Sequence, residues 1–264
     1  MTLLIDSGNS RIKVGLTNSG QAAEGDVLTL AHADLDQLLP WLAARAPGKG
    51  RALGVNVAGA SVGERIAARL AQAGHTIEWI LPAARMLGLQ NSYRDPTQLG
   101  ADRWMGMLGV WSSVAAPRPP LLLATFGTAT TVDTTGPDDV YAGGLILPGP
   151  ALMRESLAAG TAQLPRAAGT VAAYPQDTHA AITTGVAAAQ AGAVLRQCLQ
   201  ARGRYGTMPE VFVSGGGWPD VEAETRALLS SAAGTHGVPA TILRFVPHPV
   251  LDGLARLAAV TPRS

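Results

Sequence analysis

"LLIDSGNSRIKVGL", residues 3–16, places a carboxylate between an apolar run and a glycine-containing turn. The apolar run ends at Asp6, the turn follows at residues 7–10, and a second run begins at Arg11. In the second run apolar and polar residues alternate, which is typical of a half-buried β-strand. The stretch therefore predicts two strands joined by a short turn, with Asp6 near the end of the first strand.

The turn of this predicted hairpin has the composition of a phosphate-binding loop. The small residues Gly8, Asn9 and Ser10 leave backbone N–H groups accessible, and a concave set of amides binds anions. A carboxylate such as Asp6 repels phosphate unless Mg²⁺ lies between them, and Mg²⁺ is commonly held by one or two carboxylates together with phosphate oxygens. Lys13 on the returning strand would add positive charge. An ordinary β-turn explains the hairpin equally well, so the hairpin alone does not decide the function.

A similar phrase, "LLATFGTA" at residues 122–129, repeats the pattern of "LLIDSGNS" at residues 3–10. Both are apolar strands that enter a glycine turn, and the order of expected elements around them, β-β-β-α-β-α-β-α, is also similar. Recurrence of similar segments indicates repeated structure. The proline-rich segment 116–120 separates the two copies. We therefore expect an α/β protein with two similar halves, residues 1–116 and 117–264.

The remaining periodicity predicts alternating strands and helices. Ser61 and Glu64 have the spacing of a capping box, and Gly74 is placed to end the same helix. Residues 82–96 show no clear period and are expected to be irregular. The expected strands are 2–6, 11–16, 26–31, 51–57, 76–80, two within 121–135, 141–149, 210–214 and 240–246. The expected helices are 34–45, 61–74, 97–115, 150–160, 178–201, 218–233 and 250–260.

Three further segments carry residues suited to nucleotide chemistry. Small residues at 127–130 form a second turn that would face the first across a cleft, and "SGGG" at 214–217 suits a base or ribose. "QLGADRWMG", residues 98–106, places Asp102 and Arg103 at the start of an apolar helix. There a carboxylate can accept the proton of a substrate hydroxyl, and an arginine can bind a carboxylate or phosphate. An Asp that only stabilises the helix dipole explains this phrase at least as well.

Composition excludes several classes of function. The chain has 20 Lys or Arg and 19 Asp or Glu, with no charge run, so neither nucleic acid nor a membrane is an expected partner. No apolar stretch is long enough to span a membrane and no signal peptide is recognisable, so we expect a cytoplasmic protein. Cys198, the single cysteine, is expected to be a buried structural thiol. The five histidines have no metal-ligand spacing and are expected at the surface or in loops.

Five phrases together carry a resemblance to a known family: "DSGNSRIKVGL", "YRDPTQLGADRW", "TFGTATTVD", "GGLILPG" and "SGGG". In this order they resemble the type III pantothenate kinases, a family that includes members called Bvg accessory factor, over essentially the whole chain. The resemblance implies the duplicated actin-like, ribonuclease H-like α/β fold of the acetate kinase, sugar kinase, Hsp70 and actin superfamily, with a nucleotide cleft between the halves. It also implies an enzyme that converts ATP and pantothenate into ADP and 4′-phosphopantothenate, the first step of coenzyme A biosynthesis.

The resemblance assigns roles to individual residues. Asp102 is expected to act as the catalytic base, and Asp6 to lie near Mg²⁺, through phosphates or water. The residues expected to bind ATP are Asp6, Ser7, Gly8, Asn9, Ser10, Arg11, Ile12, Lys13, Thr128, Gly215 and Gly216. The residues expected to bind pantothenate are Tyr93, Gly100, Ala101, Asp102, Arg103 and Thr178. The resemblance further implies a homodimer with pantothenate near the subunit interface.

Two positions depart from the family pattern. The second loop of the family usually reads D-x-G-T-A, with its Asp binding a monovalent cation, K⁺ or NH₄⁺, and here that position is Thr125. A neutral hydroxyl is a poor replacement for a carboxylate, so the cation is either held differently or lost. Asp177 stands where the family usually has Asn and adds negative charge near an anionic substrate. The alternative functions are a regulatory or ligand-sensing protein without turnover, and hydrolysis of polyphosphate or a nucleotide.

Overall fold

A computed structural model describes residues 1–18, 27–161, 164–165, 169–236 and 242–261. The chain forms two compact units: residues 1–115 together with 248–264 form the first, and residues 116–247 form the second. This division differs from the expected halves at the C-terminus, where 248–264 join the first unit. Expected features that fall on residues 19–26 or 237–241 lie outside the described residues.

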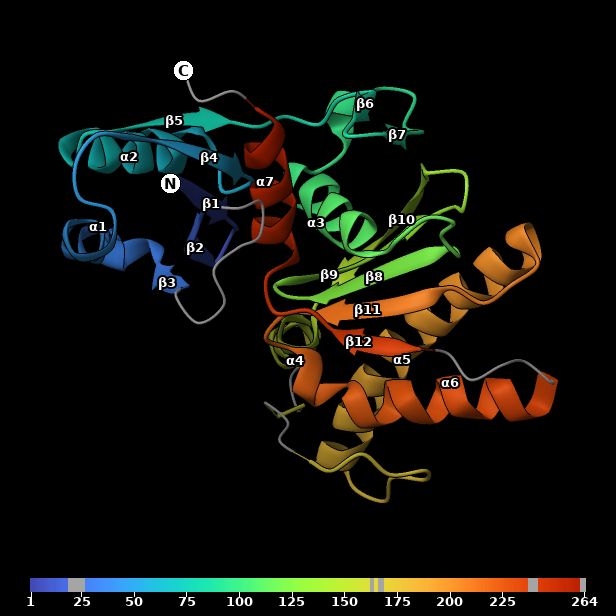
Figure 1. Ribbon diagram of the computed structural model, residues 1–264. Coiled ribbons are helices and arrows are strands. Elements are labelled where there is room, and N and C mark those ends of the chain that lie inside the picture. Colours follow the sequence, from blue (N-terminus) through green and yellow to red (C-terminus); the bar gives the residue numbers. More distant parts are fainter. Residues whose placement is uncertain (19–26, 162–163, 166–168, 237–241, 262–264) are drawn as a thin grey trace. The chain divides into compact units, whose positions relative to one another are not determined.

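Five strands form the sheet of the first unit, in the spatial order β3-β2-β1-β4-β5 (Figure 1). β1, β2 and β3 are antiparallel neighbours, whereas β4 runs parallel to both β1 and β5. The strands are β1 (Thr2–Ser7), β2 (Arg11–Thr17), β3 (Leu28–Ala31), β4 (Gly50–Asn56) and β5 (His75–Trp79). The α-helices of this unit are α1 (Leu38–Arg45), α2 (Ala60–Gln72), α3 (Ala101–Ser113) and α7 (Pro249–Val260), and short 3₁₀ helices are η1 (His32–Gln37) and η2 (Pro96–Gln98).

The two faces of this sheet carry different helices. Alternate residues of β1 and β2, such as Ile5 and Ile12, pack with η1, α1 and α2 in one hydrophobic core. On the other face α7 packs against β1, β2 and β4, and α3 packs against α7. Buried Leu251 and Leu254 of α7 belong to these contacts, which explains why the C-terminal helix joins the first unit.

The expected capping box of α2 is wrong. The helix begins at Ala60, one residue before Ser61, and its N-cap residue Gly59 makes no side-chain capping bond. Asn56 organises the approach instead, because its Oδ1 accepts from Ala58 N–H and its Nδ2 donates to the Gly59 carbonyl. Gly74 does follow the helix, with a positive φ of 84° that favours glycine.

A hairpin within the segment expected to be irregular was not predicted. β6 (Arg85–Met86) pairs with β7 (Leu89–Asn91), and the turn between them is Leu87-Gly88. Both turn residues have positive φ, 54° and 106°, as two-residue type I′ turns require. The sequence does not indicate this turn, because Leu rather than Asn or Asp occupies the first of these positions.

The sheet of the second unit repeats the topology of the first. The strands of this sheet that belong to residues 116–247 lie in the order β10-β9-β8-β11-β12, with β8, β9 and β10 antiparallel and β11 parallel to both β8 and β12 (Figure 1). The strands are β8 (Leu121–Phe126), β9 (Ala129–Thr135), β10 (Val140–Pro148), β11 (Glu210–Ser214) and β12 (Leu243–Phe245). The helices are α4 (Pro150–Gly160), α5 (Thr178–Tyr205), η3 (Trp218–Asp220) and α6 (Glu222–His236).

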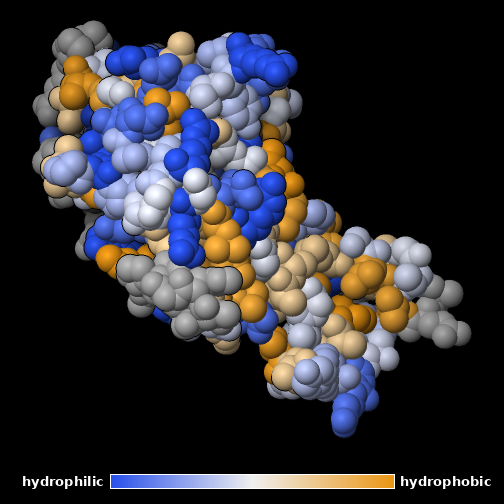
Figure 2. Space-filling view, turned by 90° about the vertical axis from the view of Figure 1, so that its right-hand side faces the viewer, coloured by the Kyte–Doolittle hydropathy of each residue, from blue (hydrophilic) through white to orange (hydrophobic). Residues whose placement is uncertain are grey.

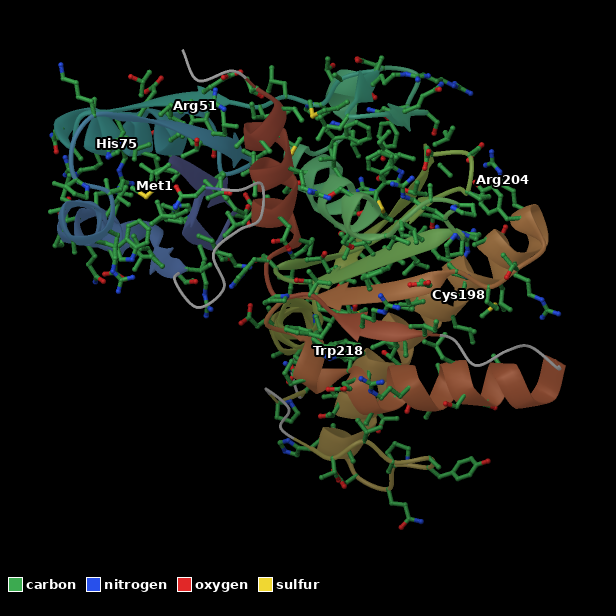
Figure 3. The ribbon with its side chains drawn as sticks, in the orientation of Figure 1. Met1, Arg51, His75, Cys198, Arg204 and Trp218 are labelled. Carbon is green, nitrogen blue, oxygen red and sulfur yellow. The ribbon has the colours of Figure 1, made fainter. Side chains whose placement is uncertain are left out.

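The repeat extends to the burial of individual side chains. β1 and β8 have the same sequence of buried and half-buried positions, and so do β2 and β9. The expected α/β class with two similar sheets is therefore confirmed. In the second unit α5 packs on β8 and β9, and Cys198 of α5 lies in that core, where burial raises the pKa of its thiol to about 12 (Figure 3). The expectation of a buried structural thiol is confirmed.

Candidate active site

The β1–β2 hairpin brings Asp6 and Lys13 together. The two residues are directly opposite each other in the antiparallel register, so their side chains project from the same face of the sheet. The turn between the strands is closed by the Gly8 N–H, which donates to the Arg11 carbonyl at 3.0 Å. The Gly8 amide is therefore occupied within the hairpin, and the accessible amides of the expected phosphate loop begin at Asn9.

Two of the residues expected to contact the nucleotide point away from this face. Ser7 and Ile12 form the next pair in the register, and both are fully buried. Ile12 belongs to the core formed with α1 and α2, so its side chain lies on the opposite side of the sheet from Asp6. Ser7 and Ile12 can therefore contribute only backbone atoms to a ligand site on the Asp6 face.

Asp102 of α3 is an electrostatic neighbour of Asp6. Burial raises the pKa of Asp6 to about 6, the Lys13 ammonium opposes this rise, and the Asp102 carboxylate adds to it. Two carboxylates and one lysine from three different elements of the first unit are therefore electrostatically coupled. Like charges that are partly withdrawn from water in this way favour a bound cation or a shared proton.

The start of α3 determines how Asp102 is presented. Gly100 is the N-cap residue, and Asp102 Oδ1 accepts the Arg103 N–H at 2.8 Å. A Cβ on Gly100 would lie only 2.7 Å from this Oδ1, so glycine allows the carboxylate to turn back over the helix end. Burial raises the pKa of Asp102, opposed by the hydrogen bond and the charge of Arg103.

Arg103 connects α3 to the segment that precedes it. Its guanidinium is almost fully buried, and Nη1 donates to the Tyr93 hydroxyl at 3.2 Å. The Tyr93 N–H in turn donates to Asn91 Oδ1 at 3.0 Å, at the end of β7. Two of the residues expected to bind substrate, Tyr93 and Arg103, are therefore in contact, and Ala101 and Gly100 lie in the same turn.

A close crossing of α3 and α7 holds these elements in place. A Cβ on Gly109 of α3 would lie 2.2 Å from the Pro249 carbonyl, and a Cβ on Gly253 of α7 would lie 2.1 Å from the Met105 carbonyl. Only glycine fits at both positions, since real Cβ contacts do not reach such distances. The helices approach backbone to backbone about one to two turns beyond Asp102.

Sequence reasoning missed His248 as a neighbour of the site. It is the N-cap residue of α7 and is half-buried; burial and the Lys13 charge both lower its pKa. The sequence analysis assigned the C-terminal helix to the second half, so it did not indicate that His248 lies in the same unit as Lys13. The expectation that every histidine is at the surface or in a loop is also wrong for His75, which is buried in β5 and bonded to the Ala46 carbonyl at 3.0 Å (Figure 3).

In the second unit, glycine-bearing segments converge on the second loop. The Gly127 N–H donates to the Ala129 carbonyl at 3.1 Å, and the Gly149 N–H donates to the Thr128 carbonyl at 2.9 Å. A Cβ on Gly149 would lie 2.0 Å from the Gly127 carbonyl. The start of α4 is thus packed directly against Thr128.

The glycine turn after β11 lies beside the same loop. Gly215 has φ of 97° and its Cβ position is occupied by the Phe126 backbone, while the Gly217 N–H donates to the Phe126 carbonyl at 2.9 Å. Gly216 has open space at its Cβ position. The Phe126 ring packs against Trp218 at 5.5 Å between centroids. The structure therefore brings Thr128 and Gly215 to the same region of the second unit.

Thr125 occupies the position in β8 that Asp6 occupies in β1. Its cross-strand partner is Thr131, so the charged Asp6–Lys13 pair of the first hairpin corresponds to a neutral pair here. The carboxylate of Asp133, two residues further along β9, is fully buried and accepts the Tyr141 hydroxyl at 2.6 Å. Thr125 therefore supplies no charge to a cation.

Thr178 is the first residue of α5 and is exposed in the second unit. Asp177 before it is the N-cap, and its Oδ1 accepts the Ala180 N–H at 2.9 Å. Asp and Asn are both favourable N-cap residues, so this bond explains how Asp177 can stand where the family usually has Asn.

The donor set around Asp6 fits Mg²⁺ in number and type. Among the described residues no group of three or more His, Cys, Asp or Glu side chains could hold a metal. Mg²⁺ needs only one or two protein carboxylates when phosphate oxygens and water complete its shell, and Asp6 offers a half-buried carboxylate beside a lysine. In the described part of the chain, no helix is both long and apolar enough to cross a membrane.

Comparison with known proteins gives a consistent result. A family model described as type III pantothenate kinase matches residues 2–200. The type III pantothenate kinase of Bordetella petrii is 54% identical over 259 residues, covering 98% of this chain and 97% of the relative. That of Bordetella pertussis is 54% identical over 262 residues, covering 98% of each.

Among solved structures, a conserved putative Baf family transcriptional activator from Campylobacter jejuni has a similar fold. The TM-score is 0.56 at 17% identity, with 97% of this chain and 96% of the other covered. At this identity the likeness concerns the fold alone.

Proposed function

Because the chain belongs to the type III pantothenate kinase family, which phosphorylates pantothenate with ATP for coenzyme A biosynthesis, we propose that Asp6, Lys13 and Asp102 form the reacting centre. The electrostatic contact between Asp6 and Asp102 carries this proposal. It supports a site in which a cation-binding carboxylate and a basic carboxylate act together, as transfer of phosphate to a hydroxyl requires. A regulatory protein without turnover is not favoured, since relatives at 54% identity are named as kinases.

The first loop holds the phosphates of ATP in this proposal. Amides from Asn9 onward and the Lys13 ammonium supply the positive potential, while Arg11 is exposed on the same strand. Asp6 holds Mg²⁺ either directly or through water. When bound, the ion neutralises phosphate charge and orients the terminal phosphate. In the second unit, Thr128 contacts the phosphates, and Gly215 with Gly216 gives backbone access for the adenosine.

Asp102 acts as the base. It takes the proton of the pantothenate 4′-hydroxyl while that oxygen forms a bond to the γ-phosphorus of ATP. The bond between the γ-phosphorus and the oxygen that bridges the β- and γ-phosphates breaks, and ADP leaves. Burial makes this carboxylate more basic than an exposed aspartate, which suits the role. Arg103 supplies a cation for the pantothenate carboxylate, with Tyr93, Gly100, Ala101 and Thr178 as the other substrate contacts.

The monovalent-cation site of the family is altered in this chain. The Thr125–Thr131 pair offers only neutral oxygens, and Asp133 is already hydrogen-bonded to Tyr141. A pair of hydroxyl oxygens lacks the charge with which a carboxylate attracts K⁺ or NH₄⁺. We therefore include in the proposal that this kinase depends little on K⁺ or NH₄⁺.

A homodimer completes the proposal. α4 is exposed along nearly its whole length and leaves Leu152 and Leu157 accessible, and Figure 2 shows hydrophobic residues at the surface among hydrophilic ones. Exposed apolar groups of this kind favour a protein contact. A second copy of the chain that covers α4 would lie next to Thr128, because Gly149, the N-cap residue of α4, donates its N–H to the Thr128 carbonyl.

Product formation tests the proposed function. Purified protein is incubated with ATP, Mg²⁺ and pantothenate, with matched mixtures lacking pantothenate, and phosphopantothenate is measured by mass spectrometry. The proposal predicts ADP and phosphopantothenate in equal amounts. Phosphate release that does not require pantothenate would indicate a hydrolase instead. Absence of phosphopantothenate in both K⁺ and NH₄⁺ buffers would contradict the proposed kinase function.

A further inference from the structure

The Gly8 carbonyl in the first loop is held by a side chain from outside the hairpin. His32 Nε2 lies 2.9 Å from the Gly8 oxygen. A carbonyl oxygen only accepts hydrogen bonds, so Nε2 must carry the hydrogen. His32 Nδ1 is buried and forms no hydrogen bond within the described part of the chain, so Nε2 makes the hydrogen bond of this ring.

The strand register explains why His32 reaches the loop. Ala31, the last residue of β3, is opposite Arg11, the residue whose carbonyl closes the Gly8 turn. His32 follows Ala31 directly and begins η1. Its own carbonyl accepts from Arg65 Nη2 of α2 at 3.1 Å, so the histidine backbone is attached to a helix while its ring holds the loop.

This contact fixes the direction of one amide of the loop. In a planar trans peptide the C=O and the N–H point in opposite directions. The Gly8 carbonyl and the Asn9 N–H belong to the same peptide, so a ring that holds the carbonyl on one side aims the Asn9 N–H to the other. The preceding peptide, formed by the Ser7 carbonyl and the Gly8 N–H, is fixed at both ends, because the Ser7 carbonyl accepts the Val57 N–H at 2.9 Å and the Gly8 N–H donates to the Arg11 carbonyl.

We propose that His32 is a positioning residue that aims the Asn9 amide at the nucleotide phosphate. It does not touch the substrate. Without its hydrogen bond the Gly8–Asn9 peptide is free to rotate, because glycine permits many backbone conformations, and the amide loses its orientation. This inference rests on the proposed role of the first loop in holding ATP.

The test compares His32→Ala and His32→Gln with wild type. Gln can place its side-chain N–H near the position of Nε2, whereas Ala removes the donor. The measured quantities are kcat, KM for ATP, KM for pantothenate and the melting temperature. We expect His32→Ala to raise KM for ATP at least tenfold and change KM for pantothenate less than twofold. His32→Gln should recover most of the ATP affinity.

His75 provides a matched control. It is also a histidine of the first unit bonded through Nε2 to a backbone carbonyl, but that carbonyl, Ala46, lies outside the loop. His75→Ala should lower the melting temperature without raising KM for ATP selectively. If it raises KM for ATP as much as His32→Ala does, the effect is general destabilisation and the inference is wrong. His32→Leu, which keeps side-chain volume without a donor, replaces His32→Ala if the latter does not fold.

Lys13→Met separates this inference from the proposed function. If Lys13→Met raises KM for ATP while His32→Ala leaves it unchanged, His32 has no positioning role and the loop assignment stands. If neither variant changes KM for ATP, the loop does not hold the nucleotide and both proposals fail.

Discussion

Asp6 shows how one residue's burial connects stability with function. Its position after an apolar run was evident from the sequence, and so was the nearby lysine. The proximity of Asp102 was implied only by the family resemblance, because 96 positions of chain separate the two residues and the packing of α3 against α7 and β4 determines where Asp102 lies. Likewise Ser7 and Ile12 were expected at the nucleotide, but strand alternation buries their side chains on the opposite face.

Replacing Asp6 with Asn should stabilise the unliganded protein in a pH-dependent way. Burial raises the pKa of Asp6 from 3.8 to about 6, so the folded state binds this proton more tightly than the unfolded state. Stability from this group is therefore lost as pH rises from about 4 to about 6. We expect Asp6→Asn to raise the free energy of unfolding by on the order of 3 kcal/mol at pH 7.5 and roughly half that at pH 5.

Urea denaturation at the two pH values measures this difference. Asp34→Asn, at an exposed aspartate of η1, is the control and should change stability little at either pH. The same Asp6→Asn variant should be nearly inactive, because the proposed ligand for Mg²⁺ is lost. A destabilised Asp6→Asn protein at pH 7.5 would mean that the ionised carboxylate is well compensated without a cation.

Thr125 leads to a prediction about salts. Steady-state rates in K⁺, NH₄⁺ and Na⁺ buffers of equal ionic strength should differ by less than about threefold, because the Thr125–Thr131 pair carries no charge to select a cation. Thr125→Asp should acquire a stronger dependence on K⁺. A wild-type enzyme that is inactive in Na⁺ and active in K⁺ would show that other groups hold the cation.

At the scale of elements, the sequence was informative wherever local signals agree with packing. α4 was predicted with its observed bounds, and the starts of α5 and α7 were within one residue. The β6–β7 hairpin was missed because Leu87 adopts a positive φ that its side chain disfavours, and the α2 cap was misplaced because Asn56 fixes the preceding turn. These features depend on contacts that no local pattern encodes.

The crossing of α3 and α7 depends on Gly253. Its Cβ would lie 2.1 Å from the Met105 carbonyl, so Gly253→Ala must push the helices apart. We expect a loss of about 1–3 kcal/mol in the free energy of unfolding and a lower kcat, because α3 carries Asp102. Gly192→Ala in α5, where nothing lies within 4 Å of the Cβ position, is the control and should be neutral or slightly stabilising. Equal stability of both variants would show that the helices separate without cost.

At the scale of the whole molecule, the repeated topology was predicted from one pair of phrases together with the similar order of expected elements around them, and the two sheets confirm it. The C-terminal segment was assigned to the other half because chain order was taken as a guide. Burial of Leu251 and Leu254 against α3 and the first sheet overrides that order. Sequence position alone could not reveal this exchange, since an amphipathic helix fits either sheet equally well.

Self-association through α4 can be measured in solution. Sedimentation equilibrium should give a dimer for wild type and a monomer for the double variant Leu152→Glu with Leu157→Glu, because charges on α4 would have to be desolvated at the interface. Leu199→Glu, at a comparably exposed leucine of α5, should remain dimeric. A dimer that persists in the double variant would place the interface elsewhere.

The kinetics of Asp102→Asn test the central claim most directly. Asn keeps the size of the side chain and its hydrogen bond to the Arg103 N–H but cannot take a proton, so the fold and ATP binding should persist. We predict a fall in kcat of about 10²–10⁴-fold for phosphopantothenate formation, with the dissociation constant for ATP within threefold of wild type. A variant that turns over pantothenate at the wild-type rate would contradict the account, because Asp102 would then not be the base.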